Sequence, residues 1–248
     1  MNETMVKLSL MVVKCMSKFN KIFERLAKVN DRSIIWNNWL DYCININLLS
    51  NKKYEIDFKG NEEAYAEMLG CWLLELNKDL ETKPYSDMLG KFYEELVTSH
   101  AKSKSIGQFF TPTDVTDLMV DLVCDEIKQN TFAYDCACGS ARMLLSSHVK
   151  SNGRLYCIGQ DLDEVSCKMA VLNFWSHGVR GSILHQNSIT LEFYQAWRVN
   201  NYLYHGLPLP HIELVNERDA YNFIGVKHDE VKPIELNKRK ETIQSKLW

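Results

Sequence analysis

The feature that most constrains the fold is a change in the spacing of apolar residues near residue 105. Before this point apolar residues recur every three or four positions, which places them on one side of a helix. Four such stretches occur, at residues 5–29, 34–49, 61–80 and 86–97. Beyond it the apolar runs are short and strand-like, at residues 131–135, 155–161 and 182–186. Helical stretches separate these runs, so the sequence predicts a helical unit followed by an α/β sheet whose first three strands are parallel.

We divide the chain at this change. The helical N-terminal domain is expected to cover residues 1–105, because the polar stretch from Ser99 to Ser105 has the composition of a linker. The α/β core is expected to follow at residues 106–226, with a sheet shorter than usual for its class. The remaining residues, 227–248, are polar and mildly basic, and we expect a tail that packs weakly or frays.

Charge is distributed unevenly along the chain. The formal net charge of -3 argues against a uniformly basic nucleic-acid binder, yet residues 1–30 hold six Lys or Arg against two Glu. In the first predicted helix the basic residues form a stripe beside the apolar one, at Lys7, Lys14, Lys18, Lys21, Arg25 and Lys28. This stripe is either the solvated face of a packing helix or a surface for phosphate contact or partner docking. Any contact with DNA is therefore expected to be local.

Cysteine usage and hydropathy indicate the cellular compartment. Most of the eight cysteines occupy periodic, apolar positions, as free thiols do in a reducing compartment. Cys136 and Cys138 stand close together, but no second Cys or His pair lies at ligand spacing, so no metal site is expected. No apolar stretch approaches the length of a membrane span. The sequence therefore predicts a cytoplasmic protein.

Two acidic residues end the predicted strands at the places where open α/β sheets bind nucleotide-like cofactors. Asp135 leads through a turn of small residues, including Gly139, into a helix. Asp161 follows 26 residues later, where an acidic side chain commonly accepts hydrogen bonds from ribose hydroxyls. The alternative is that Asp161 caps the helix that begins near Asp163. A phosphate-binding loop and a dinucleotide fingerprint are excluded, because neither Gly-Lys-Ser/Thr nor three spaced glycines are present.

A helix start precedes the first strand. In the segment IGQFFTPTDVTDLM, Thr111 can cap a helix, Pro112 fits its first turn, and Asp114 completes a Thr-x-x-acid box. Taken alone, this segment indicates only a well-formed helix N-terminus.

Together these segments are similar to a known family. GQFFTP before a helix, D-x-A-C-G-S after the first strand and G-x-D at the end of the second resemble the N6-adenine DNA methyltransferases that serve as modification subunits of type I restriction-modification systems. The resemblance covers about residues 85–189 and includes DMLGKFYEELV and MAVLNFWSHG. It implies a Rossmann-like methyltransferase core for residues 106–226, S-adenosylmethionine as cofactor, DNA as substrate and a specificity-type subunit as partner.

The resemblance also implies roles for individual residues. The methionine end of the cofactor would be walled by Phe110, Thr111 and Pro112. Its amino and carboxylate groups would lie in the turn that holds Asp135, Ala137, Cys138, Gly139 and Ser140. The nucleoside end would meet Asp161 at the ribose, Leu162 against the adenine and Asn187 at the adenine edge.

The sequence departs from the family pattern in two places. The usual Asp-Pro-Ala-Cys-Gly-Ser-Gly has Cys136 in place of proline, and Ala141 in place of the last glycine adds a Cβ where backbone is expected to approach the ligand. The catalytic Asn/Asp-Pro-Pro-Tyr/Phe motif is absent, because no two of the five prolines are adjacent. Asn200, Asn201 and Tyr202 stand near the expected distance, but we interpret them as a chance match. No catalytic residue is assigned.

Two classes of function follow from this pattern. The first is an adenine-N6 DNA methyltransferase, or a fragment of its modification subunit. The second is a non-catalytic methyltransferase-fold module that binds cofactor, DNA or a partner subunit. A small-molecule methyltransferase fits less well, because GQFFTP and the helical unit are typical of the DNA-modifying group. Because its catalytic motif is missing, the isolated chain is expected to transfer methyl groups very weakly or not at all.

Overall fold

The fold is that of a computed structural model. It describes residues 18–49, 53–58, 60–98, 111–123, 132–203 and 209–222. Four features predicted above lie outside the described residues: the start of the first helix, the linker at residues 99–105, Phe110, and the tail at residues 227–248.

The N-terminal unit is helical, as predicted. Residues 18–26 form a helix, and three more follow, α2 (Arg32–Asn47), α3 (Glu62–Leu80) and α4 (Met88–Leu96). The Asp31 carboxylate caps α2 by accepting hydrogen bonds from the amides of Ser33 and Ile34 at 2.8 and 3.3 Å. The basic side chains of the first helix face solvent where they are described, at Lys18, Lys21, Arg25 and Lys28.

Three helix ends differ in detail from the predicted stretches 5–29, 61–80 and 86–97. Val29 is 81% exposed, because the helical residues end at residue 26 and the chain turns before the cap of α2. Asn61 precedes α3 but makes no side-chain cap bond. The cap of α4 is Asp87, whose carboxylate accepts from the Gly90 amide at 2.9 Å. Ser86 does not open that helix, because its hydroxyl bonds to Asp79 instead.

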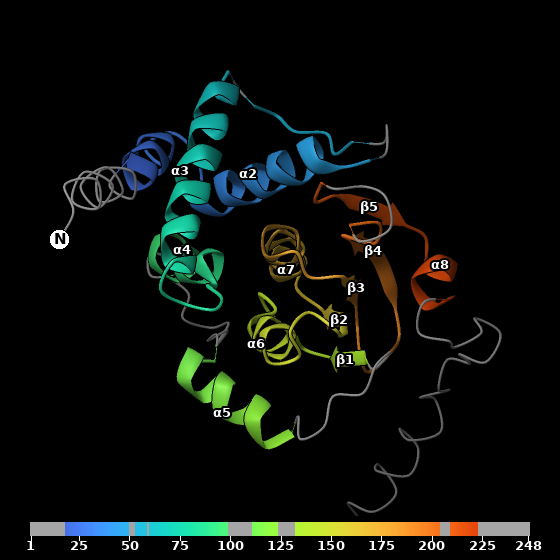
Figure 1. The fold of residues 1–248 in the computed structure, drawn as a ribbon. Coiled ribbons are helices and arrows are strands. Elements are labelled where there is room, and N and C mark those ends of the chain that lie inside the picture. Colours follow the sequence, from blue (N-terminus) through green and yellow to red (C-terminus); the bar gives the residue numbers. More distant parts are fainter. Residues whose placement is uncertain are drawn as a thin grey trace, which may run out of the picture.

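The first three strands are parallel, which confirms the prediction. They are β1 (Phe132–Asp135), β2 (Tyr156–Asp161) and β3 (Gly181–Gln186), and each pairs in parallel with the next. Two helices form the crossovers, α6 (Arg142–Lys150) and α7 (Glu164–His177), and both lie on the same face of the sheet (Figure 1). All three carboxyl ends therefore meet at one edge of the sheet.

The rest of the sheet is antiparallel, a completion after residue 190 that the sequence left open. The strands β4 (Phe193–Val199) and β5 (Ile212–Val215) complete a five-stranded sheet in the order β1-β2-β3-β4-β5. A short turn after β3 leaves no length for a crossover, so β4 must return antiparallel. The helix α8 (Glu217–Asn222) lies on the face opposite α6 and α7 (Figure 1). Among the described residues, no strand pairs with the outer edge of β1.

One more helix lies beside α6. This is α5 (Thr113–Val123), and the amide of Thr116 donates to the Pro112 carbonyl at 2.9 Å. The sequence predicted Thr111 as the cap and Pro112 as the first helical residue. The helix begins instead at Thr113, one residue later. The Asp117 carboxylate of α5 accepts from the Tyr85 and Ser146 hydroxyls at 2.6 Å each, which ties α5 to the start of α4 and to α6.

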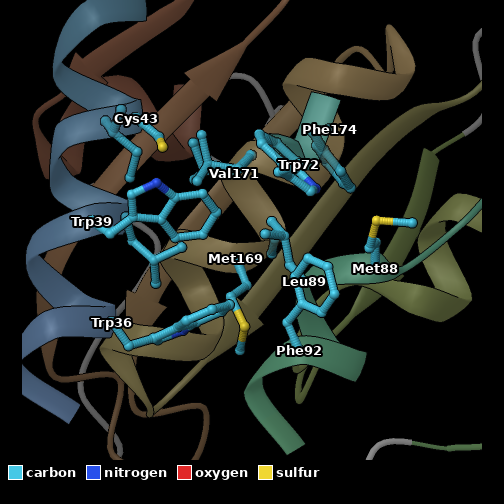
Figure 2. Packing of buried hydrophobic residues seen from close by; sticks show 14 of the residues in the cluster. Trp36, Trp39, Cys43, Trp72, Met88, Leu89, Phe92, Met169, Val171 and Phe174 are labelled. Carbon is cyan, nitrogen blue, oxygen red and sulfur yellow. The ribbon is translucent and has the colours of Figure 1, made fainter. Parts of the chain in front are cut away.

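One apolar core joins the helical unit to the α/β part. Figure 2 shows Trp36, Trp39 and Trp72 of the helical unit packed with side chains of α7, including Met169 and Phe174. All five side chains are fully buried. Burial of a side chain of this size contributes about 1.5–3 kcal/mol, so this contact is a major source of stability.

A buried ion pair crosses the same contact. Lys168 of α7 is 2% exposed, and its ammonium lies 2.8 Å from Asp41 of α2 and 2.8 Å from Glu164. It also donates to Asn37 at 2.9 Å. The Lys168 charge is therefore paired with acidic residues of both the helical unit and α7.

No described helix is both long and apolar enough to cross a membrane.

Candidate functional site

The predicted cofactor residues meet at the carboxyl ends of β1 and β2. In the parallel register Asp135 lies beside Gly159, so Asp161 follows only two residues further along the neighbouring strand. The turn from Cys136 to Ala141 runs from β1 across this edge into α6. The structure thus brings together Asp135, the turn and Asp161, which the sequence placed 26 residues apart.

Asp161 braces this turn. Its Oδ2 accepts the Gly139 amide at 2.8 Å, and its Oδ1 accepts the Asp163 amide at 2.9 Å. The cap of α7 is Asp163, which accepts the Ser166 amide at 2.9 Å. The alternative that Asp161 is the helix cap is therefore wrong. Each Asp161 oxygen keeps acceptor capacity for a further hydrogen bond.

The turn packs tightly on β2. The Cys138 amide donates to the Gln160 carbonyl at 2.8 Å. A Cβ at Gly159 would lie 2.8 Å from Ile183 and 2.9 Å from the Cys138 sulfur, so this strand position requires glycine. Burial raises the pKa of the Cys138 thiol well above its usual value, so the thiol is a packing group and not a nucleophile.

Asp135 lies in a less favourable environment for a charge. Its Oδ1 accepts the Ala137 amide at 3.1 Å. Burial raises the pKa of Asp135, the amide bond opposes this, and the nearby Asp161 carboxylate adds to it. Two carboxylates at one strand edge repel each other, and a cationic group placed between them would relieve this repulsion.

The turn holds two residues in left-handed conformations. Gly139 has φ 54°, and Ala141, at the N-cap position of α6, has φ 71°. A non-glycine residue at such a φ costs roughly 1–2 kcal/mol. The Ala141 side chain is fully buried in the core, so its Cβ does not narrow the edge as the sequence suggested. Alanine in place of the family's glycine at position 141 therefore affects the backbone conformation of the turn and not the space at the edge.

The helix-start motif connects to the same turn. The carbonyl of Thr111 accepts a hydrogen bond from Arg142 Nη1 at 2.5 Å, and Pro112 follows as an exposed residue. Phe110, the third predicted member of this wall, lies outside the described residues.

The predicted nucleoside contacts divide into two kinds. Leu162 is 58% exposed directly after Asp161, so its side chain is free to pack against a planar group. Asn187 follows β3, and its side-chain oxygen accepts the amides of Ile189 and Thr190 at 2.9 and 3.1 Å. Asn187 therefore shapes the turn into β4, and only its amide nitrogen remains to meet a ligand.

Sequence reasoning missed His185. It pairs with Asp161 in the sheet register, and its Nε2 lies 3.1 Å from the Leu162 carbonyl. Its ring also packs on Tyr194, with centroids 4.6 Å apart. A polar aromatic residue in an otherwise apolar strand run was the only signal available. The Tyr194 contact depends on the antiparallel return of β4, which the sequence did not indicate.

The segment that resembled a catalytic motif lies elsewhere. Val199 pairs with Gly181, the first residue of β3, so Asn200 lies at the amino ends of the parallel strands, opposite the candidate site. The Asn200 side chain is fully buried and donates to the carbonyls of Phe174 and Val179. It also accepts the His211 amide at 3.1 Å. All of its polar groups are used in structure, which supports the chance-match interpretation.

A separate cavity of about 550 Å³ lies between the start of α4 and α5. Its lining includes Asp87, Pro112 and Arg142 but neither Asp135 nor Asp161. The cavity therefore lies next to the turn but not at the strand ends where Asp135 and Asp161 meet.

Comparison with known proteins finds a family to which this segment is similar. Residues 85–200 match the sequence profile of the family described as N-6 DNA Methylase. They contain the whole candidate site and all of α4.

Two relatives are type I restriction enzyme methylase subunits. The chain is 36% identical over 98 residues to the type I restriction enzyme MjaVII methylase subunit of Methanocaldococcus jannaschii, covering 38% of this chain and 17% of the relative. It is 30% identical over 170 residues to the MjaIX methylase subunit of the same organism, covering 66% and 25%. The matched part thus spans a quarter or less of the length of these relatives.

A solved structure is also similar in sequence. The type I restriction-modification methyltransferase subunit of Streptococcus thermophilus is 29% identical, with 48% of this chain and 25% of that chain covered and a TM-score of 0.34. The mixed five-stranded sheet with flanking helices confirms the predicted α/β class. Residues 85–200 are thus similar to the N-6 DNA methylase family.

Proposed function

We propose that this chain is the S-adenosylmethionine-binding segment of an adenine-N6 DNA methylase, with its site at the carboxyl ends of β1 and β2. The observation that carries the proposal is the meeting of Asp135, the Gly139 turn and Asp161 at one sheet edge. This is the position at which open α/β sheets hold nucleotide-like ligands.

The residues at this edge fit such a cofactor. Asp161 has acceptor capacity left for ribose hydroxyls, and the exposed Leu162 offers an apolar surface for adenine. Asp135 supplies a carboxylate whose charge is destabilised by burial and by Asp161, and a cationic neighbour such as an amino group would stabilise that charge. The cofactor would supply an activated methyl group on a sulfonium. The protein's part is to bind, orient and exclude water.

The proposed substrate is adenine in DNA, flipped out of the helix for methylation at N6. Support comes from the family match and from the GQFFTP segment. We further propose that a specificity-type subunit and local contacts by the exposed basic residues of the first helix provide DNA binding. The described part of that stripe faces solvent, although Lys18 lies 2.5 Å from Glu67.

A second candidate is a non-catalytic module that binds cofactor, DNA or a partner. Two observations favour it: Asn200 lies at the opposite end of the strands, and no two prolines in the sequence are adjacent. Transfer needs the amine held within about 3–3.5 Å of the methyl group, which requires rigid acceptors.

Calorimetric titration of the chain with S-adenosylmethionine tests the proposed site. We expect saturable binding of one cofactor per chain and a rise in the unfolding temperature with cofactor concentration. Absence of both at millimolar cofactor would overturn the cofactor assignment.

Methyl transfer separates the two candidates. We predict no transfer above background when the chain alone is incubated with tritiated cofactor and unmethylated DNA, because the paired prolines that position the amine in this family are absent. The same assay is then run with the specificity-type and other subunits encoded beside it. Transfer in that mixture supports the methylase, and its absence supports the non-catalytic module. Transfer by the chain alone, lost in Asn201→Ala, would contradict the prediction.

A further inference from the structure

Asp87 is a buried carboxylate held in a fixed position by its own helix. Its side chain is 2% exposed, and its Oδ1 accepts the Gly90 amide at 2.9 Å. A Cβ at Gly90 would lie 2.3 Å from Asp87 Oδ2, so the carboxylate occupies the space that any other residue would fill. The sequence Asp-x-x-Gly thereby places the carboxylate against the first turn of α4.

Four further hydrogen bonds reach this carboxylate from elements distant in sequence. Oδ2 accepts the Ser140 hydroxyl at 2.6 Å, and Arg142 Nε and Nη2 at 3.0 and 2.8 Å. Oδ1 also accepts Asn173 Nδ2 of α7 at 2.8 Å. A carboxylate offers about four acceptor positions, so five donors saturate it. Asp87 therefore has no capacity left for a ligand, and any effect on a ligand must pass through its partners.

These partners make up the turn of the candidate site. Ser140 follows Gly139, whose amide is held by Asp161. Arg142 also donates to the Thr111 carbonyl at 2.5 Å. Asn173 donates a second bond to the Ser140 carbonyl at 2.8 Å. One carboxylate on the helical unit thus links the turn, the helix-start motif and α7.

The turn needs such support. Ala141, between Ser140 and Arg142, has a left-handed backbone with φ 71°. A non-glycine residue keeps such a conformation only where its surroundings impose it. The residues on both sides of Ala141 bond to Asp87, so these bonds supply the constraint.

We propose that Asp87 is a positioning residue, through which the helical unit holds the Gly139–Arg142 turn in the conformation that binds the cofactor. This inference rests on the proposed cofactor site. It predicts that loss of the Asp87 charge releases the turn without removing any group that touches the cofactor.

The test compares Asp87→Asn with Asp41→Asn. Both carboxylates belong to the helical unit, both are buried, and both pair with a cation of the α/β part, but Asp41 pairs with Lys168 away from the turn. Cofactor affinity is measured by calorimetry at a temperature where all variants are folded, with tryptophan fluorescence as the check on folding. We expect Asp87→Asn to weaken S-adenosylmethionine binding by about tenfold or more, and Asp41→Asn to change it by less than about twofold.

Hydrogen exchange supplies a second readout that does not depend on the cofactor. Peptides spanning residues 136–145 should exchange faster in Asp87→Asn and at the parental rate in Asp41→Asn. Arg142→Lys, which keeps a cation beside Asp87, should retain affinity better than Arg142→Gln. Equal affinity and equal exchange in the two Asn variants would overturn the proposal. If the parent chain binds no cofactor, the proposed function fails, and the exchange rates alone decide whether Asp87 holds the turn.

Discussion

At the scale of single residues, the surroundings of each aspartate decide its role. Asp161 and Asp163 are two positions apart, yet Asp163 caps α7, whereas Asp161 reaches back to the turn of the preceding strand. Asp135 lies beside them with a pKa raised mainly by burial. The residue type alone does not distinguish these three, because the hydrogen-bond donors that each meets come from different elements.

The first prediction concerns Asp161. Asp161→Ala removes the proposed ribose acceptor and the partner of the Gly139 amide, and removal of a charged acceptor costs about 1.5–3 kcal/mol, roughly ten to a hundredfold in affinity. Calorimetric titration with S-adenosylmethionine measures the loss. Asp163→Ala is the matched control, since it removes a helix cap worth about 1 kcal/mol of stability but no proposed contact. If Asp161→Ala binds as tightly as the parent chain, the ribose assignment is wrong.

The second prediction concerns Asn200, whose replacement should lower stability and leave cofactor affinity unchanged. Asn200→Ala leaves buried carbonyls and an amide without partners and puts alanine at φ 56°, so we expect a loss of about 3 kcal/mol in unfolding free energy. Cofactor affinity should stay unchanged, because the residue lies at the far end of the strands. Urea unfolding and calorimetry together measure both quantities. Asn201→Ala, next to it and only half-buried, is the control and should cost less than about 0.5 kcal/mol.

At the scale of elements, α7 organises the molecule. One of its faces covers the sheet, and the other meets the helical unit through the apolar contact of Figure 2 and the Lys168 ion pair. Its Asn173 also joins the Asp87 network. The helix is therefore buried nearly all round, which explains why its sequence shows no clear apolar stripe.

The Lys168 ion pair yields a prediction about this contact. Lys168→Met leaves the Asp41 carboxylate buried without its cation, and breaking a buried pair from one side costs about 3–5 kcal/mol. Replacing both partners by apolar residues, in Lys168→Met with Asp41→Leu, should recover most of that loss. Urea unfolding of the two variants gives the comparison. A double variant no more stable than the single one would show that the charges do not act as a pair.

At the scale of the whole molecule, two half-buried histidines couple stability to pH. Burial lowers the pKa of His148 and His177, with the neighbouring His177 adding to the effect on His148. His177 Nε2 accepts the Ser86 amide at 3.2 Å, so its neutral form links α7 to the helical unit. Protonation of this nitrogen would break that link.

The sign of the pH dependence follows from these directions. A histidine with a lowered pKa in the folded state contributes its full stability above the unfolded value of about 6.5 and loses it as the pH falls below that value. We expect the unfolding free energy to fall between pH 7.5 and 5.5, by at most about 1.4 kcal/mol per pH unit for each histidine. The variant His148→Gln with His177→Gln should flatten this slope, measured by urea unfolding at each pH. His185→Gln, in a histidine outside this contact, is the control, and a slope unchanged in the double variant would refute the assignment.

The sequence by itself determined the local structure. Apolar spacing located the helices α2 to α4 and the ends of β1, β2 and β3, because period and capping are properties of neighbouring residues. The acids at two strand ends also sufficed to predict that Asp135 and Asp161 would meet, since parallel strands end at one edge.

Only the tertiary structure decided the rest. The antiparallel return of β4, the contact of His185 with Tyr194 and the saturation of Asp87 all join residues that are separated along the chain or carry no local signal. Whether the segment after residue 187 pairs with β3 depends on whether that edge of the sheet is free, and a buried carboxylate's role depends on the donors around it. Both are set by how the elements pack, and no window of sequence contains that information.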